Sequence, residues 1–541
     1  MMDSAVQRTP QRVESLKAAQ DAQSGLLVIG IVGAVGAGTS WTARVLKRLL
    51  TRRTVRAVII KARDGIAGAV GEDWDTALAL RSSDPLASAS QLQELGDKLR
   101  ARHDNAIVAS AMIAEIVRHL ADEEPPAVMI CDSLRHPAEV QLLRMVYGDA
   151  YWTLGTVCDF PTRRDRLMKK LTPQGGTAPR EDEVRRFTER DEDDRTNKHG
   201  QHVAEAFELA DYFVDTSASL SRPDSPDTEL DAWPVSADLG RFLDLVRSDR
   251  ALLRPSDAEQ AMYHAYAARL GSACLSRQVG AALIDKNGQL LATGCNEVPR
   301  AGGGLYGQGE GDGEERERGR CHSLNGYCSN TRERNAIVDD ILNLFEEHGV
   351  KVEDAAKRED LVKGLRKSRL GQLIEFSRSV HAEMDAVASA ARKGVSTVGG
   401  KLFVTTFPCH NCARHIVAAG VDEVQFIEPY LKSKALSLHA DSITQSSEGW
   451  TAPSVARSKG VAGPHRVLFR PYVGAAPRLY RRAFVKDGEL KDGMTGDLLP
   501  QLQPEPGFMR LRPLRRGYED LQQSVAKAFT IATGPASAGG Q

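Results

Sequence analysis

The sequence predicts an α/β protein built from two successive folded domains. The first observation is an apolar strand at 26–32 that runs through a glycine-rich turn into an amphipathic helix. The second is a similar change from strand to helix at 401–417, in the other half of the chain. A chain of 541 residues, 41% of them apolar, is long enough for more than one hydrophobic core.

The glycine-rich turn after the first strand has the composition of a phosphate-binding loop. Its glycines would let backbone N–H groups and the amino terminus of the next helix surround phosphate oxygens. The residues that we expect at a bound nucleotide are Gly33, Gly36, Gly38, Thr39 and Ser40. Thr39 takes the position at which such loops carry lysine, whereas Ser40 is placed for Mg²⁺. Without the lysine, nucleotide binding is expected but hydrolysis or phosphoryl transfer is disfavoured.

A second apolar strand, at 127–132, ends in Asp132, as a strand that faces Mg²⁺ would. The segment 133–139 that follows resembles P-loop nucleotide kinases, and so do the helix and strand expected at 200–214. The resemblance implies a P-loop kinase-like domain with a parallel sheet over residues 25–217, which would take a nucleoside triphosphate with Mg²⁺. A chance glycine turn is the alternative.

Changes in composition divide the rest of the chain. Residues 1–24 are polar and helix-like rather than secretory, and residues 218–255, rich in Ser, Asp and Pro at their start, are expected to link the two domains. Ser256, with a glutamate three residues later, matches a capping box and opens the second domain, 256–532. Residues 533–541 are expected to form a disordered tail.

Two short motifs in the second domain carry the chemistry. His381 and Glu383 form an HxE motif, and Cys409 and Cys412 belong to a PCxxC motif. The spacing of the cysteines puts both sulfurs on one face of a helix start, where the helix dipole favours thiolates. A neutral histidine and two thiolates give zinc three protein ligands and leave the fourth position for water. Glu383 would carry protons between that water, the ring nitrogen and the departing ammonia.

The two motifs together predict zinc-dependent hydrolytic deamination of a nucleobase. A CxxC motif alone would also fit a closed structural zinc site or a redox pair. The HxE half favours the catalytic interpretation, because Glu383 serves no purpose as a proton carrier in a closed site.

The segments 276–285 and 290–299 resemble the opening hairpin of deoxycytidylate deaminases, and the HxE and PCxxC motifs follow in the order of that family. The resemblance implies a three-layer α/β/α domain that converts deoxycytidine nucleotides to deoxyuridine nucleotides and ammonia, with Asn296 at the substrate sugar. Arg277 could bind a substrate phosphate or be a solvated surface charge. Tyr430 could stack near the substrate or be an ordinary buried tyrosine.

An insertion at 300–380 separates the hairpin from the HxE motif. Its first part, 301–315, is rich in glycine and charge, so we expect a mobile loop that could act as a lid. A helical stretch with apolar positions from Ile337 to Phe345 follows. A second, structural zinc is conceivable, although no second CxxC pair completes the set. Its candidate ligands are Cys321, His322, Cys328 and His410.

The order of the two domains resembles that of bacterial antiphage cytidine deaminases. The resemblance implies deamination of dCTP and dCMP during infection, depletion of the dCTP pool, inhibition by a small non-coding RNA, and a homo-oligomer. A formal net charge of -1 disfavours a general nucleic-acid binder, and dispersed cysteines without an apolar span suit a cytoplasmic protein with no membrane contact. Two alternatives stay open: a DNA or RNA cytidine deaminase, and a P-loop nucleotide sensor with a structural zinc.

Overall fold

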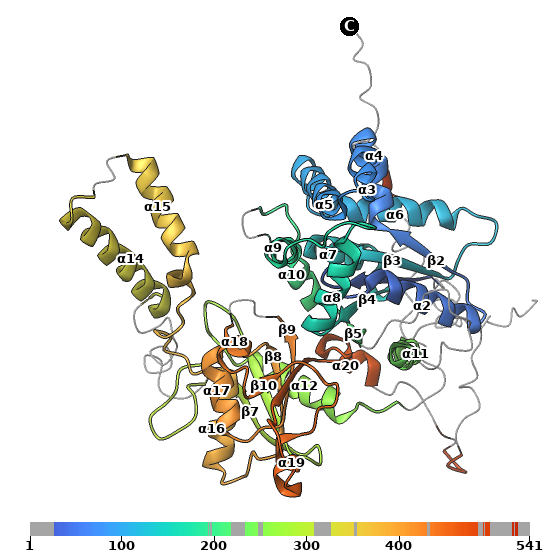
Figure 1. Ribbon diagram of the computed structural model, residues 1–541. Helices are drawn as coiled ribbons and strands as arrows, with labels where there is room; N and C mark the ends of the chain where they lie inside the picture. Colours follow the sequence, from blue (N-terminus) through green and yellow to red (C-terminus); the bar gives the residue numbers. More distant parts are fainter. Residues whose placement is uncertain are drawn as a thin grey trace, which may run out of the picture. The chain divides into compact units, whose positions relative to one another are not determined.

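The computed structural model divides into two compact units, one formed largely by residues up to 253 and the other by residues 254–484 (Figure 1). Among the described residues, no helix is long and apolar enough to cross a membrane. The residues that the structure describes are 26–192, 194, 197–217, 233–246, 253–307, 326–350, 354–429, 433–484, 491, 493–497, 522–523 and 525–527.

The sheet of the first unit is parallel. Its strands lie in the order β5-β4-β1-β3-β2. Their bounds are β1 Leu27–Val32, β2 Ala57–Lys61, β3 Val128–Leu134, β4 Tyr151–Val157 and β5 Tyr212–Asp215. Every residue of β1 is buried, which explains why its sequence is a continuous apolar run. The chain first adds β2 and β3 on one side of β1 and then adds β4 and β5 on its other side. The carboxyl end of β1 therefore opens at a topological switch point, where such sheets place their ligands.

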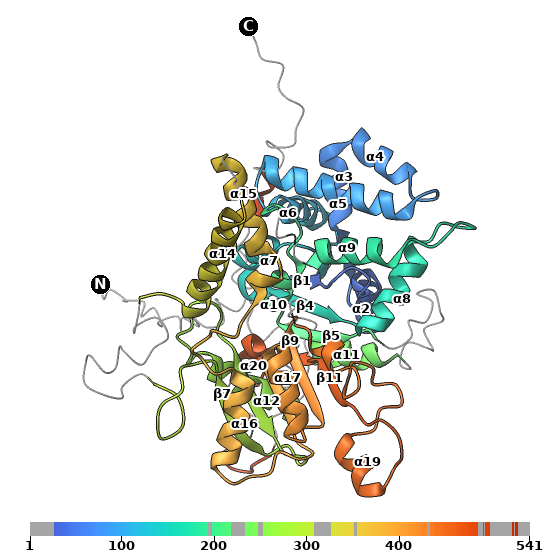
Figure 2. The same ribbon diagram turned by 60° about the vertical axis from the view of Figure 1, so that its left-hand side comes forward.

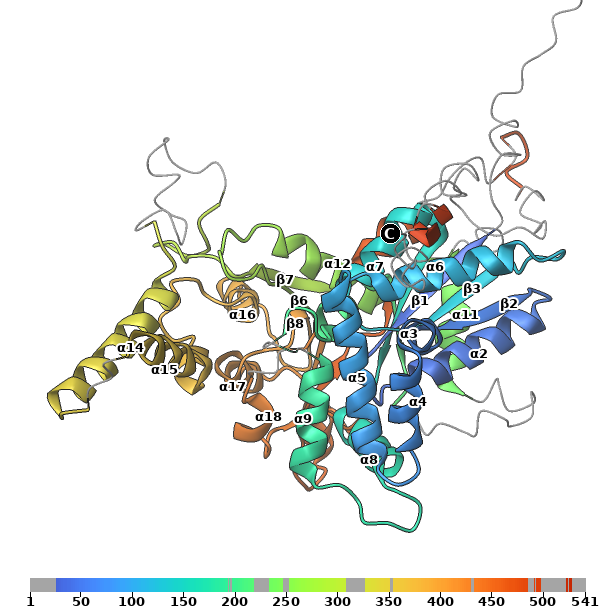
Figure 3. The ribbon, with the colours of Figure 1, turned by 90° about the horizontal axis from the view of Figure 1, so that it is seen from above.

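The helices of the first unit cover this sheet on both faces. Seen from above, α2 and α6 lie on opposite sides of β1, β3 and β2 (Figure 3). The amphipathic α2 buries mainly one stripe, as a helix against a sheet requires, whereas the first two turns of α6 are buried all round. The helices are α2 Thr39–Arg52, α3 Ala62–Val70, α4 Glu72–Ala79, α5 Pro85–Arg102, α6 Ile107–Leu120, α7 Pro137–Tyr147, the short 3₁₀ helix η1 Gly148–Ala150, α8 Phe160–Leu171, α9 Glu181–Glu192, α10 Val203–Glu208 and α11 Pro234–Val246.

The last of these helices, α11, lies inside the stretch 218–255 that the sequence predicts to be a linker. It packs against α2 and β5 of the first unit. The Trp233 ring lies 5.4 Å from that of Trp41, and the Phe242 ring lies 5.5 Å from that of Tyr212. The Ser, Asp and Pro content before 234 conceals an apolar repeat that begins directly after it, and the linker interpretation missed this helix.

The sheet of the second unit is mixed, in the order β10-β11-β9-β8-β6-β7. The strands β6 and β7 form the predicted hairpin, β6 also runs antiparallel to β8, and the remaining neighbours are parallel. The bounds of these strands are β6 Gly280–Ile284, β7 Leu290–Cys295, β8 Lys401–Thr406, β9 Glu423–Glu428, β10 Ile443–Thr444 and β11 Val467–Pro471. The short strand β12, Gly474–Ala475, is not part of this sheet.

Helices cover both faces of this second sheet. Ser256 caps the first of them through the predicted capping box, since its hydroxyl accepts a hydrogen bond from the Glu259 N–H. The other long helices belong to the insertion or to the zinc motifs. The bounds are α12 Asp257–Arg269, α14 Ser329–Glu347, α15 Ala355–Lys367, the 3₁₀ helix η3 Arg369–Gln372, α16 Ala382–Arg392, α17 His410–Ala418, α18 Ala435–Leu438, α19 Pro453–Lys459 and α20 Pro477–Phe484.

Two glycines show which helix covers which face. A Cβ on Gly280 would lie 1.9 Å from the Ala265 carbonyl oxygen of α12, and one on Gly294 would lie 2.2 Å from the Ala382 carbonyl oxygen of α16. Gly294 is paired with Ala281, the neighbour of Gly280, so the two glycines face opposite sides of the hairpin. The helices α12 and α16 therefore lie on opposite faces, and α17 packs beside α16 (Figure 2). This is the three-layer arrangement that the resemblance implies.

The insertion at 300–380 contributes α14 and α15, which pack against each other. The predicted helical stretch from Ile337 to Phe345 lies in α14, where Val338 and Leu342 are buried. Much of the glycine-rich part of the insertion, from 308 to 325, lies outside the described residues.

Candidate metal centre and glycine loop

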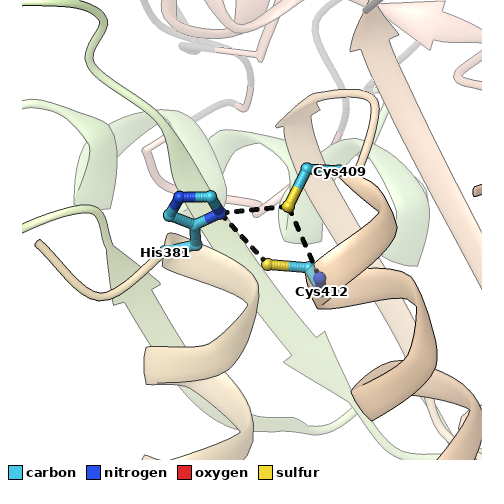
Figure 4. A group of neighbouring side chains, drawn as sticks. All are labelled: His381, Cys409 and Cys412. Carbon is cyan, nitrogen blue, oxygen red and sulfur yellow. Dashed lines mark hydrogen bonds between the residues drawn. The ribbon is translucent and has the colours of Figure 1, made fainter. Parts of the chain in front are cut away.

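The HxE and PCxxC motifs lie at the starts of two neighbouring helices. His381 is the residue that precedes α16, with an extended backbone, and Cys409 occupies the same place before α17. The strand β8 ends at Thr406 and leads directly into the Cys409 turn. Figure 4 shows the His381 ring pointing toward both sulfurs. The amino termini of two helices therefore converge on this cluster.

The three predicted ligands form a tight cluster. The His381 Nδ1 atom lies 3.2 Å from the Cys409 Sγ and 3.3 Å from the Cys412 Sγ. All ligand atoms lie within 4.8 Å of one another, and both cysteines are buried. One imidazole nitrogen and two sulfurs that face a common point are a donor set that fits Zn²⁺.

Cys409 is the cysteine of the cluster that loses its proton most easily. A hydrogen bond with the Cys412 thiol and contact with His381 together lower the pKa of Cys409 to about 4. The hydrogen bond to Cys409 in turn raises the pKa of His381 to about 9. Cys409 is thus a thiolate, the form in which a cysteine binds metal.

Glu383 lies in the first turn of α16, beside the cluster. Its side chain is almost fully buried and shares a hydrogen bond with the Cys412 thiol. Burial raises the pKa of the Glu383 carboxyl. A carboxyl with a raised pKa next to a metal site holds a proton more readily than a solvent-exposed one, which suits a group that carries protons.

Asn296 holds the turn before the hairpin strand β6. Its Oδ1 accepts a hydrogen bond from the Val279 N–H at 2.6 Å, and its Nδ2 donates to the Arg277 carbonyl oxygen at 2.7 Å. The side chain is buried and ties the end of β7 to the start of β6. These contacts give Asn296 a structural task that the resemblance did not indicate.

Arg277 forms an ion pair with Glu428 at 3.3 Å, although nearly half of its side chain is exposed. The sequence interpretation missed Glu428, which is 3% exposed and also pairs with Arg269 at 3.1 Å. Its second oxygen accepts a hydrogen bond from the Thr406 hydroxyl at 2.7 Å. No local motif marks a glutamate whose partners lie far apart in the sequence. The third predicted substrate residue, Tyr430, lies outside the described residues.

The second zinc site stays a prediction, because two of its four candidate ligands, Cys321 and His322, lie outside the described residues. Cys328 precedes α14, and His410 is the first residue of α17. Within the part of the chain that the structure describes, His381, Cys409 and Cys412 are the single cluster of possible metal ligands.

The glycine loop lies between β1 and α2. Gly36 and Gly38 have φ angles of 85° and 86°, which side chains other than glycine rarely adopt. A Cβ on Gly33 would lie 1.9 Å from the Thr156 hydroxyl.

Ser133 links Thr39 and Asp132, two more of the residues that the sequence predicts at the nucleotide. The Thr39 and Ser133 hydroxyls are 3.0 Å apart, and Ser133 donates to the Asp132 Oδ1 at 2.8 Å. The Ser133 hydroxyl therefore bridges Thr39 and Asp132, and Ser40, half-buried, is the second residue of α2.

Known proteins resemble the second unit. Residues 255–428 match the family described as "Cytidine and deoxycytidylate deaminase zinc-binding region". The deoxycytidylate deaminase of Enterobacteria phage T4 is 28% identical over 174 residues, which are 31% of this chain and 77% of that protein. The ComE operon protein 2 of Bacillus subtilis (strain 168) is 39% identical over 54 residues, 10% of this chain and 29% of that protein.

A solved dCMP deaminase from the cyanophage S-TIM5, in complex with dCMP and dUMP, is 22% identical. The matched region covers 34% of this chain and 91% of the cyanophage chain, with a TM-score of 0.20. The family match, together with the His381, Cys409 and Cys412 cluster, leads to one conclusion. The second unit contains a domain of the cytidine and deoxycytidylate deaminase type, with a ligand cluster that fits zinc.

Proposed function

We propose that the chain is a zinc-dependent enzyme that hydrolyses deoxycytidine nucleotides, dCTP or dCMP or both, to deoxyuridine nucleotides and ammonia. The observation that carries the proposal is the buried cluster of His381, Cys409 and Cys412 with the Glu383 carboxyl beside it. The deoxycytidylate deaminases among the relatives support the choice of substrate class.

In this reaction the chain would supply three zinc ligands and one carboxyl that carries protons. Zinc, held by His381, Cys409 and Cys412, supplies Lewis-acid activation of a water molecule. Glu383 accepts a proton as the water oxygen bonds to the ring carbon that carries the amine, and it delivers a proton to the ring nitrogen. It then takes the remaining proton of the added hydroxyl group and passes it to the amine, as the carbon–nitrogen bond breaks, the carbonyl forms and ammonia leaves. Burial of Glu383 keeps bulk water from competing for these protons.

Arg277 and Asn296 are the proposed substrate contacts. The Arg277 guanidinium is held by Glu428 yet stays half exposed, so it can offer its remaining N–H groups to a phosphate. Asn296 fixes the backbone from which Arg277 extends. The pair would favour a nucleotide over a free base.

Replacing Glu383 by Gln tests the mechanism, because the amide keeps the shape of the side chain but cannot shuttle protons. We expect ammonia release from dCTP and dCMP to fall by at least about a hundredfold, while bound zinc stays stoichiometric. Glu359→Gln, on the exposed helix α15, is the matched control and should keep full turnover. Undiminished ammonia release by the Glu383 variant would refute the assignment.

We propose further that the first unit binds a nucleoside triphosphate with Mg²⁺ and regulates the deaminase rather than catalysing phosphoryl transfer. Support comes from the parallel strand order, in which the glycine loop follows the strand at the switch point, and from the absence of a loop lysine. Rapid ATP hydrolysis by the purified protein would contradict this role.

The biological setting that we propose rests on the resemblance to antiphage deaminases. The enzyme would act in the cytoplasm as a homo-oligomer, deplete dCTP in infected cells, and be inhibited by a small RNA. Measuring the dCTP pool after infection, with and without the Glu383→Gln variant, tests it. An equal pool in both strains would exclude depletion as the mechanism.

A further inference from the structure

An acidic side chain of the first unit already lies on the glycine loop. The Asp191 carboxylate of α9, 1% exposed, accepts a hydrogen bond from the Val35 N–H at 2.6 Å. Such a short distance is typical of a charged acceptor. A backbone amide of the loop therefore binds an anionic oxygen, and the chain itself supplies that oxygen from a position 156 residues away.

The same carboxylate holds an arginine at the loop. The Arg135 Nη1 atom lies 2.8 Å and 3.1 Å from the two Asp191 oxygens, and it also donates to the Gly33 carbonyl oxygen at 3.1 Å. Arg135 follows β3, the strand beside β1. A cation from the neighbouring strand thus lies at a loop whose own sequence has Thr39 where a lysine is usual.

The backbone at Arg135 is held by a buried carboxylate. The Glu139 carboxylate, completely buried, accepts hydrogen bonds from the Arg135 N–H at 2.8 Å and from the His136 N–H at 3.2 Å. Its other oxygen pairs with Arg100 of α5 at 2.8 Å. Because the backbone of Arg135 is fixed by this buried pair, the guanidinium can change partners without a change in fold.

The start of the helix α2 adds a positive potential at the loop, because α2 begins at Thr39 with no side-chain cap and no acidic residue in its first turn.

We propose that Arg135 supplies the positive charge that the glycine loop lacks at Thr39, and that Asp191 is an internal competitor displaced by the polyphosphate of a nucleoside triphosphate. This inference rests on the proposed nucleotide-binding role of the first unit. In the free protein Arg135 pairs with Asp191, and in the complex it pairs with phosphate.

The exchange of partners gives the two residues of one ion pair opposite effects on binding. Arg135→Gln removes the charge that the phosphate needs, so affinity falls. Asp191→Asn keeps the shape of the side chain but removes the competing charge, so affinity rises. If the pair only stabilised the fold, both substitutions would weaken binding together.

Titration calorimetry on the full-length protein tests this, with MgATP and with inorganic tripolyphosphate as separate probes. We expect Arg135→Gln to weaken binding of both by about 10- to 100-fold, and Asp191→Asn to tighten it. Arg186→Gln is the matched control, since Arg186 is exposed on the same helix as Asp191 and pairs only locally with Asp182. If Arg135→Gln fails to fold, Arg135→Lys should show a smaller loss, because it keeps the charge but not the planar fork.

The calorimetry distinguishes failure of the proposed partner exchange from failure of nucleotide binding by the first unit. Binding by the wild type that weakens in both variants, or changes in neither, would overturn the partner exchange and leave nucleotide binding standing. Absence of binding by both the wild type and Asp191→Asn would overturn nucleotide binding as well. Binding by Asp191→Asn when the wild type shows none would support the competitor directly.

Discussion

At the scale of single residues, the position of Glu428 leads to a prediction about substrate affinity. Glu428→Gln keeps the hydrogen bond to Thr406 but removes the charge that orients Arg277. We expect KM for dCMP to rise about tenfold, the worth of one charged hydrogen bond, with kcat and zinc content nearly unchanged. Steady-state kinetics measure this, and Glu448→Gln, an exposed residue of the same unit, is the control. A lower kcat at constant KM would show that Glu428 acts on the chemistry instead.

The zinc-ligand cluster can be predicted from the sequence, whereas the contacts around it cannot. His381, Cys409 and Cys412 can be recognised because zinc chemistry fixes both the residue types and their spacing along helix starts. Glu428 cannot, because it acquires its partners Arg269 and Arg277 through pairing of strands and helices that are distant in the sequence. Asn296 is predicted as a contact, but its hydrogen bonds to the backbone appear only in three dimensions.

At the scale of elements, the strands and helices around the motifs follow from local patterns. The apolar runs that become β1 and β8 and the capping box of α12 were all predicted. The helix α11 was missed, because the composition before it favoured a linker while its burial depends on contacts with α2 and β5. The opposed positions of α12 and α16 could not be predicted from spacing, since they depend on which face of the hairpin each helix approaches.

Gly294 offers a test of how α16 positions the site. Gly294→Ala would place a Cβ 2.2 Å and 2.5 Å from backbone atoms of Ala382 and Ala386, so α16 must move together with His381 and Glu383. We expect a loss of about 1–3 kcal/mol in unfolding free energy and a marked loss of deamination. Gly364→Ala, in α15 with open space around it, should be neutral or slightly stabilising. Full activity of the Gly294 variant would show that the close approach is dispensable.

At the scale of the whole molecule, the chain divides into two compact units. Only the second contains the zinc cluster among the described residues, so metal should stabilise that unit alone. In calorimetry we expect two transitions, of which a chelator lowers one by about 5 °C or more. Cys409→Ser should lower the same transition and abolish the effect of the chelator. Equal melting with and without chelator would contradict a bound metal at this site.

The central claim is that the second unit deaminates deoxycytidine nucleotides. Its most direct test is chromatography of the purified, zinc-loaded protein after incubation with deoxycytidine, dCMP, dCTP, cytidine nucleotides and single-stranded DNA. We predict deoxyuridine nucleotides from dCMP or dCTP, and no deaminated base in the DNA. Deamination of the DNA without conversion of either deoxynucleotide, or no product from any substrate, would contradict the account.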